Sequence, residues 1–195
     1  MDVSRRITAT VPIRVERADG ERWGDLAQLF GRAGASNGCW CQYWLLGPGY
    51  CRRDRALNQD ALRHECVSAP KLFPGLIAYR DERAVGWARV CPRSRLSWLN
   101  RRFAGHLPDG DDTWSLSCFY VPGRERGVGV MTALIFAATK VARREGLTLE
   151  AYPVDSAVET ATRNRFTGVL QPFLRAGFTE VQRLSTDRAL VRSTA

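Results

Sequence analysis

Residues 113–146 read "TWSLSCFYVPGRERGVGVMTALIFAATKVARREG", and this stretch decides the fold. The first nine residues are rich in aromatic and β-branched side chains, which is typical of a strand, and residues 129–146 have the apolar spacing of a long helix. Gly127 and Gly129 lie in the connection and allow the backbone to turn so that its N–H groups converge. Since the helix adds the positive end of its dipole, the loop is suited to bind an anionic phosphate.

Other interpretations of this glycine loop stay open. The glycines would also be needed if the segment were only a tight turn from a strand to a helix. Neither usual nucleotide loop fits, because the Walker loop requires G-x-x-x-x-G-K-[ST] and the dinucleotide loop requires three glycines and a later acidic ligand for the ribose.

Hydrophobic periodicity on both sides of this stretch predicts the remaining elements. We expect an α+β fold, with a mixed and mostly antiparallel sheet of about seven strands flanked by helices on both faces. One domain over residues 1–195, with its core at about 11–192, is expected for a chain of this length. The expected elements are strand 11–17, helix 23–30, helix 53–69, hairpin 75–92, short helix 96–103, strand 147–154, a helix near 167–177 with Pro172 inside it, and two strands within 178–192.

Composition indicates a globular protein. Hydrophobic residues make up 45% of the chain and charged residues 25%. The formal net charge of +9 comes from scattered arginines, with only two lysines, Lys71 and Lys140. Because the arginines form no stripe with interleaved aromatics, a nucleic-acid partner is not supported, and a polyanionic small molecule accounts for the charge equally well.

Six cysteines raise the question of disulfides or a metal site. The first residues carry charges where a secretion signal needs an apolar segment, so we expect a cytoplasmic protein with reduced thiols. No apolar run is long enough to span a membrane, so no membrane partner is expected. Cys39 and Cys41 are spaced irregularly for zinc, and a redox centre like that of a C-x-x-C motif is favoured even less than zinc. We expect no metal and cysteines that serve as core packing.

The pattern Arg124-x-x-Gly127-x-Gly129 resembles the R/Q-x-x-G-x-G/A motif of the GNAT superfamily of N-acetyltransferases. The strand before it, the helix after it and the "RAGF" segment at 175–178 before a final hairpin fit the same family, and the resemblance covers roughly residues 11–192. The segments "CWCQYW", "CFYV" and "EAYP" are similar to a poorly characterised bacterial branch.

The resemblance implies acetyl-CoA as the cofactor. The pantetheine arm would lie between strands 113–121 and 147–153, paired with Phe119 and Val121, and Thr132 would add a hydroxyl to the phosphate site. Only Pro122 and Gly123 separate Val121 from the motif arginine, fewer than in many relatives, so the strand residue that faces the arm stays open. The pyrophosphate would meet the motif residue Arg124 and the N–H groups of Arg126, Gly127, Val128, Gly129 and Val130.

The resemblance also directs the search for catalytic groups. The position where the family usually has a tyrosine as general acid holds Phe173, which cannot donate a proton. Near the expected thioester we therefore select Tyr152 as the acid, Glu150 as the base, directly or through water, and Cys118 as a further catalytic residue. The structural alternative is that Tyr152 packs against Pro153 and that Glu150 is a solvated strand residue or pairs with an arginine.

The segment "CWCQYW" follows the first expected helix, where the family has the mouth of its acceptor site. Trp40, Tyr43 and Trp44 are expected as pocket walls for a flat or apolar acceptor. The first hypothesis is transfer of an acetyl group to a small-molecule amine, such as an antibiotic or metabolite, by direct attack in a ternary complex of a monomer or homodimer. The alternatives are a protein N-acetyltransferase and a non-catalytic acyl-CoA-binding module.

Overall fold

The computed structural model describes residues 12–68, 74–108, 113–162 and 164–193. Their strands form one seven-stranded sheet with the order β1-β2-β3-β4-β5-β7-β6. Only β4 and β5 pair in parallel, and all the other neighbours are antiparallel. The strands are β1 Arg14–Arg17, β2 Gly75–Arg80, β3 Arg83–Pro92, β4 Thr113–Tyr120, β5 Thr148–Ala151, β6 Thr179–Ser185 and β7 Arg188–Ser193.

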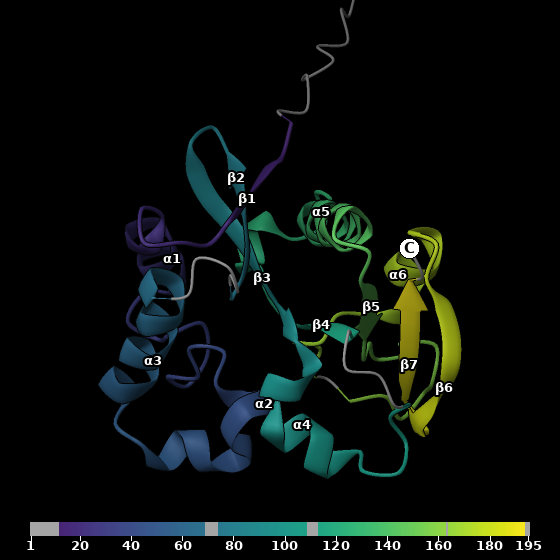
Figure 1. The fold of residues 1–195 in the computed structure, drawn as a ribbon. Coiled ribbons are helices and arrows are strands. Elements are labelled where there is room, and N and C mark those ends of the chain that lie inside the picture. Colours follow the sequence, from purple (N-terminus) through teal and green to yellow (C-terminus); the bar gives the residue numbers. More distant parts are fainter. Residues whose placement is uncertain (1–11, 69–73, 109–112, 163, 194–195) are drawn as a thin grey trace, which may run out of the picture.

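Helices cover both faces of this sheet, as Figure 1 shows. On one side, α5 and α6 pack over a core cluster that includes Leu134 and Phe173. On the other side, α1 and α3 cover a cluster around Phe30 and Trp87, and α2 and α4 cover a third cluster. The helices are α1 Trp23–Phe30, α2 Tyr43–Leu46, α3 Arg55–Ser68, α4 Ser97–Arg102, α5 Val130–Arg144 and α6 Leu170–Arg175.

Alternation along the strands explains why two cores form. In β2, Leu76 and Ala78 belong to the cluster under α5, whereas Ile77 and Tyr79 belong to the cluster under α1 and α3. Successive side chains of a strand point to opposite faces, so a strand with apolar residues at every position is buried on both sides. The predicted α+β class, the seven strands and the two covered faces are therefore confirmed.

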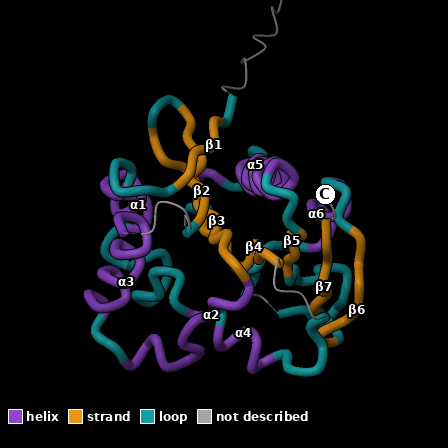
Figure 2. Tube along the Cα trace, in the orientation of Figure 1, coloured by secondary structure: helices purple, strands orange, loops and turns teal. Residues whose placement is uncertain are grey.

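The two parallel strands diverge, and this divergence positions the site. β4 and β5 pair from Thr113 opposite Thr148 to Leu116 opposite Ala151. Further along β4, the N–H of Phe119 instead donates to the carbonyl oxygen of Phe166 at 2.6 Å. Phe166 lies in the loop between β5 and α6, which Figure 2 shows without helix or strand. A loop thus occupies the gap between the separating strands.

Most predicted elements are confirmed, with shifted ends. The hairpin turns at Asp81 and Glu82 as expected, both in the left-handed region. The expected strand 147–154 is shorter, because beyond Ala151 only two isolated bridges of Val154, to Val169 and Arg188, continue the pairing. Pro172 within the expected helix 167–177 suggests a break or a late start, and the helix does start late. α6 begins at Leu170, and Pro172 is its third residue, where no intrahelical N–H is needed.

Some expectations reach beyond the described residues. Residue 11, at the start of the first expected strand, and residue 69, at the end of the expected helix 53–69, both lie outside them. One domain over residues 1–195 stays a prediction for the same reason. Of the helices that are described, none combines the length and the apolar character needed to cross a membrane.

Candidate active site

The glycine loop between β4 and α5 has an open outer side. Gly127 and Gly129 have φ angles of 78° and 88°, in the left-handed region that residues other than glycine rarely adopt. A Cβ atom added to either glycine would meet no other atom within 4 Å. The space in front of the loop is therefore free, and the glycines serve backbone conformation and access rather than close packing.

A buried carboxylate fixes the loop from below. Glu125 has a side chain that is 2% exposed, and it forms ion pairs with Arg80 of β2 and with Arg83 of β3, the latter at 2.8 Å. The Nε group of Arg126 donates to the carbonyl oxygen of Val121 at 3.0 Å. The loop is held in one conformation by contacts that sequence analysis did not reveal.

The loop presents donors to the free space. Within the described segments, no acceptor is found for the backbone N–H groups of residues 127–132. The side chain of Arg124 is 73% exposed, and Val128 is 45% exposed, whereas Val130 is buried and offers only its N–H. Free N–H groups at a helix start beside arginines are suited to bind phosphate oxygens.

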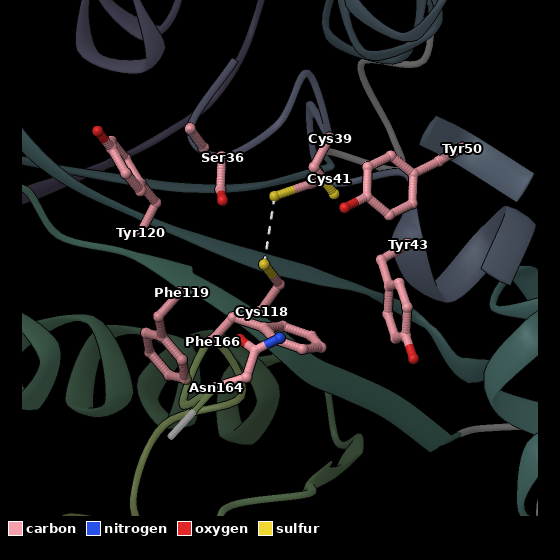
Figure 3. A pocket seen from close by; sticks show the side chains of 11 residues that line it. Ser36, Cys39, Cys41, Tyr43, Tyr50, Cys118, Phe119, Tyr120, Asn164 and Phe166 are labelled. Atoms are coloured by element: carbon pink, nitrogen blue, oxygen red, sulfur yellow. Dashed lines mark hydrogen bonds between the residues drawn. The ribbon is translucent and has the colours of Figure 1, made fainter. Parts of the chain in front are cut away.

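A cavity lies along the last residues of β4, immediately before this loop (Figure 3). Its wall contains the thiols of Cys39, Cys41 and Cys118, the polar side chains of Ser36 and Asn164, and Ala35. None of the described residues that line it carries a carboxylate or a basic group. Its aromatic residues are Tyr43, Tyr50, Phe119, Tyr120 and Phe166.

Two of the thiols are in contact. The Sγ atoms of Cys41 and Cys118 lie 3.4 Å apart, and the Nε1 group of Trp87 donates to the Cys41 sulfur at 2.9 Å. Behind them, Arg89 of β3 pairs with both carboxylate oxygens of Glu65 of α3 at 2.9 and 3.1 Å. Thus a buried ion pair supports the wall that carries the sulfur atoms.

The loop that carries Cys41 has an unusual backbone. Ala35, Asn37, Trp40 and Cys41 have positive φ angles of 68°, 51°, 42° and 57°. Such conformations cost free energy at residues other than glycine and concentrate at functional sites. Gly34 is required here, because a Cβ atom on it would lie 2.4 Å from the indole nitrogen of Trp40.

With this geometry described, the sequence can be compared with known proteins. The sequence profile of the acetyltransferase (GNAT) family matches residues 41–164, which include the glycine loop and all the cavity residues except Ala35, Ser36, Cys39 and Phe166. This protein belongs to the GNAT family. The resemblance stated from the motif Arg124-x-x-Gly127-x-Gly129 is confirmed at the level of the family.

Solved structures agree with the fold. PaiA N-acetyltransferase of Thermoplasma acidophilum, in complex with coenzyme A, is 12% identical with a TM-score of 0.57, over 94% of this chain and 99% of that one. YncA of Salmonella typhimurium, with its cofactor acetyl-CoA, is 15% identical with a TM-score of 0.55 over 93% of each chain. Ribosomal-protein-alanine N-acetyltransferase of Brucella melitensis is 17% identical with a TM-score of 0.54, over 93% of this chain and 99% of that one. No curated protein sequence matches this GNAT protein.

The expected acceptor wall is corrected by the structure. Of the three aromatic residues selected from the sequence, only Tyr43 lines the cavity. Trp40 packs against Phe30 under α1, and Trp44 donates its Nε1 hydrogen to the carbonyl oxygen of Ser117 at 3.0 Å in another core cluster. Cys39 and Cys41 line the cavity, and Cys41 also belongs to the buried cluster under α1 and α3, so the expectation of core packing holds for Cys41.

The selected acid and base lie together, away from the cavity lining. The Tyr152 hydroxyl donates to Glu150 at 2.6 Å and contacts the hydroxyl of Ser115 at 2.6 Å, and all three residues are fully buried. Glu150 also pairs with Arg93 and Arg192, at 3.3 and 3.1 Å. Burial, and then the charge of Glu150, raise the pKa of Tyr152 well above its ordinary value. The pairing of Glu150 with arginines is one of the alternatives that the sequence left open, and neither Tyr152 nor Glu150 lines the cavity.

Phe173 also lies in the core. Its ring packs against Phe119 and Phe178, at centroid distances of 6.0 and 5.2 Å. It contributes apolar packing between α6 and the sheet, and it does not line the cavity. Of the selected catalytic residues, only Cys118 does.

Proposed function

We propose that this GNAT protein is an acetyl-CoA-dependent N-acetyltransferase that modifies a small-molecule amine. The observation that carries the proposal is the open glycine loop with free N–H groups, placed directly beyond a cavity at the end of β4. Membership of an acetyltransferase family supports transfer of an acyl group. The nature of the acceptor is our own inference from the cavity.

The pyrophosphate of the cofactor is assigned to the glycine loop. The N–H groups of Gly127 to Val130 would donate to phosphate oxygens, the guanidinium of Arg124 would add charge, and Thr132 would offer its hydroxyl. The N–H of Arg126, also expected as a donor, already donates to the carbonyl oxygen of Gly123 at 3.3 Å. Coenzyme A in the PaiA structure and acetyl-CoA in the YncA structure support this choice of cofactor. Glu125 keeps the loop preorganised, so little conformational entropy is lost on binding.

The pantetheine arm is assigned to the gap beside β4. The N–H of Phe119 is a suitable donor to this arm, but it now donates to Phe166. The arm would therefore replace the Phe166 carbonyl and displace the loop before α6. One hydrogen bond is exchanged for another, so this step costs little net free energy. Val121, one residue after β4, is the second assigned contact.

The cavity determines the chemistry that follows. The thioester would lie near Cys118, and a neutral amine would attack its carbonyl carbon directly within the ternary complex. The leaving group is the thiolate of coenzyme A, and because ordinary thiols have a pKa of about 8.5, it leaves without much assistance from a general acid. We therefore assign Glu150 and Tyr152 a role in the stability of the fold rather than in catalysis. The proton that the amine loses is released to solvent at the open cavity.

The lining favours one class of acceptor. Aromatic rings and thiols dominate it, and no carboxylate among the described lining residues is present to recognise an ammonium group. A flat or apolar amine that is neutral near physiological pH fits this wall better than a polycation does, and the net charge of +9 acts against polycations as well.

Calorimetry with coenzyme A tests the cofactor site. We expect Gly127→Glu to abolish binding, because it places a carboxylate where the pyrophosphate belongs. Gly146→Glu is the matched control, since Gly146 also has a positive φ, of 66°, and open space around it, but lies after α5, away from the loop. Unchanged binding in Gly127→Glu would refute the phosphate assignment.

A thiol-release assay tests the acceptor. Acetyl-CoA is supplied with a panel of aromatic amines, polyamines and peptides, and we expect turnover with the aromatic amines. Turnover with peptides alone would favour a protein acetyltransferase, and cofactor binding without any turnover would favour an acyl-CoA-binding module.

A further inference from the structure

The cavity contains a pair of sulfur atoms that direct acetyl transfer does not use. Cys41 lies in the loop before α2, and Cys118 lies on β4, 77 residues further along the chain. Their Sγ atoms are 3.4 Å apart and face each other across the cavity wall (Figure 3). The S–S bond of a disulfide is about 2 Å long, so a short approach of the Cys41 loop would complete it.

One of the two sulfur atoms accepts a hydrogen bond from a tryptophan. The Nε1 group of Trp87 donates to the Cys41 sulfur at 2.9 Å, and the Cys118 sulfur lies within hydrogen-bond distance of it, at 3.4 Å. An indole N–H can only donate, so the sulfur of Cys41 is the acceptor of this contact. Arg89 lies opposite Cys118 in the pairing of β3 with β4, and adds a positive charge behind the pair.

The surroundings shift the pKa values of the two thiols in opposite directions. Burial raises the pKa of Cys41, but three effects together lower it by more: the hydrogen bond with Cys118, the charge of Arg89 and the hydrogen bond from Trp87. The net pKa of Cys41 is therefore below its ordinary value. The hydrogen bond to Cys41, followed by burial, raises the pKa of Cys118 well above its ordinary value. Burial and the charge of Cys41 raise the pKa of Cys39 to about 11, which keeps this third thiol protonated.

We propose that Cys41 and Cys118 are an oxidation site, at which a hydroperoxide converts the two facing thiols into a disulfide across the cavity. An oxidisable site needs a thiolate, access from solvent and a resolving thiol within reach. Here both thiols line the cavity, which leads to the pair although Cys41 itself is only 4% exposed, and Cys118 is the resolving thiol.

The chemistry balances with the hydroperoxide as the only oxidant. The Cys41 thiolate attacks an oxygen of the peroxide, an S–O bond forms, the O–O bond breaks, and the leaving alkoxide or hydroxide takes up a proton. The Cys118 sulfur then attacks the sulfur of the resulting sulfenic acid, an S–S bond forms, and the hydroxyl group leaves as water with the Cys118 proton. Two thiols lose two electrons in total, and the peroxide gains them.

The disulfide would act on the cavity that the proposed function uses, and this consequence rests on that proposal. It would tie the loop of Cys41 to β4, directly beside Phe119, where the acetyl end of the cofactor is assigned. We expect the oxidised protein to lose turnover and to recover it when dithiothreitol reduces the bond.

Mass spectrometry of the wild-type protein tests the site without any assay of activity. After treatment with hydrogen peroxide, we expect the intact mass to fall by two hydrogens and a peptide cross-linked through Cys41 and Cys118 to appear. Intact thiols at both positions, or a disulfide through Cys39, would overturn the inference. Coenzyme A binding to the reduced protein is measured in parallel, and its absence would refute the proposed function but leave the disulfide result standing.

Two variants separate the roles of the thiols. In Cys118→Ser we expect the sulfenic acid of Cys41 to persist and to react with dimedone. Cys51→Ser is the matched control, because Cys51 is exposed and its thiol donates only to the carbonyl oxygen of Pro48. In this variant the disulfide between Cys41 and Cys118 should form as in the wild type. Dimedone labelling of another cysteine in Cys118→Ser, with none at Cys41, would contradict the assignment of the thiolate.

Discussion

The ion pair behind the cavity wall should contribute strongly to stability, and Glu65→Gln tests this. Arg89 has a side chain that is 1% exposed, and its partner Glu65 is 8% exposed. The glutamine keeps the size of the side chain but leaves the guanidinium of Arg89 buried without a counter-charge. Removing one partner of a buried pair costs about 3–5 kcal/mol, so we expect a loss of about 3 kcal/mol, at the lower end because the amide oxygen still accepts a hydrogen bond.

The loss should depend on pH in a defined direction. Burial raises the pKa of Glu65, but the charge of Arg89 and its hydrogen bonds lower it more, so the net pKa lies below the ordinary value. A carboxylate with a depressed pKa in the folded state stabilises the protein fully above its unfolded pKa. This stabilisation is lost as the pH falls through the folded pKa. The difference between the wild type and Glu65→Gln should be complete above about pH 5 and should shrink in more acidic solution.

Urea unfolding followed by tryptophan fluorescence measures both effects. The matched control is Glu145→Gln, which removes an exposed carboxylate paired with the exposed Arg144, and no measurable change is expected from it. A loss in Glu65→Gln below about 1 kcal/mol at neutral pH, or a loss of equal size at acidic pH, would show that the ion pair does not hold the wall as described.

Three further changes probe the site. Tyr152→Phe should retain turnover and lower the free energy of unfolding by about 1–2 kcal/mol, because it removes only the buried hydroxyl; a large loss of turnover in stably folded protein would restore the tyrosine as the acid. Gly34→Ala should lower the free energy of unfolding by about 2 kcal/mol more than Gly105→Ala, since both glycines have positive φ but only Gly34 abuts Trp40. Equal losses of the two variants in urea unfolding would contradict the clash with Trp40. Coenzyme A binding should speed hydrogen exchange in the loop around Phe166, and unchanged exchange by mass spectrometry would place the pantetheine arm elsewhere.

Local patterns in the sequence were sufficient for most of the fold. The alternation in 75–92 and the strand, glycine loop and helix over 113–146 depend on neighbours in the chain, so they could be predicted before any long-range contact was known. The short helix α2 and the helical turn Gly47–Arg52 after it were not predicted, because segments of four and six residues contain too little periodicity.

The glycine loop could be recognised from its residues alone, since a left-handed backbone with open space needs glycine. The surroundings of the loop depend on long-range contacts. Glu125 meets Arg80 and Arg83 more than forty residues away, and Cys41 meets Cys118 across 77 residues. Such contacts depend on sheet order and on a loop with irregular backbone angles. For the same physical reason, the tryptophans of "CWCQYW" lie in the core while its cysteines face the cavity.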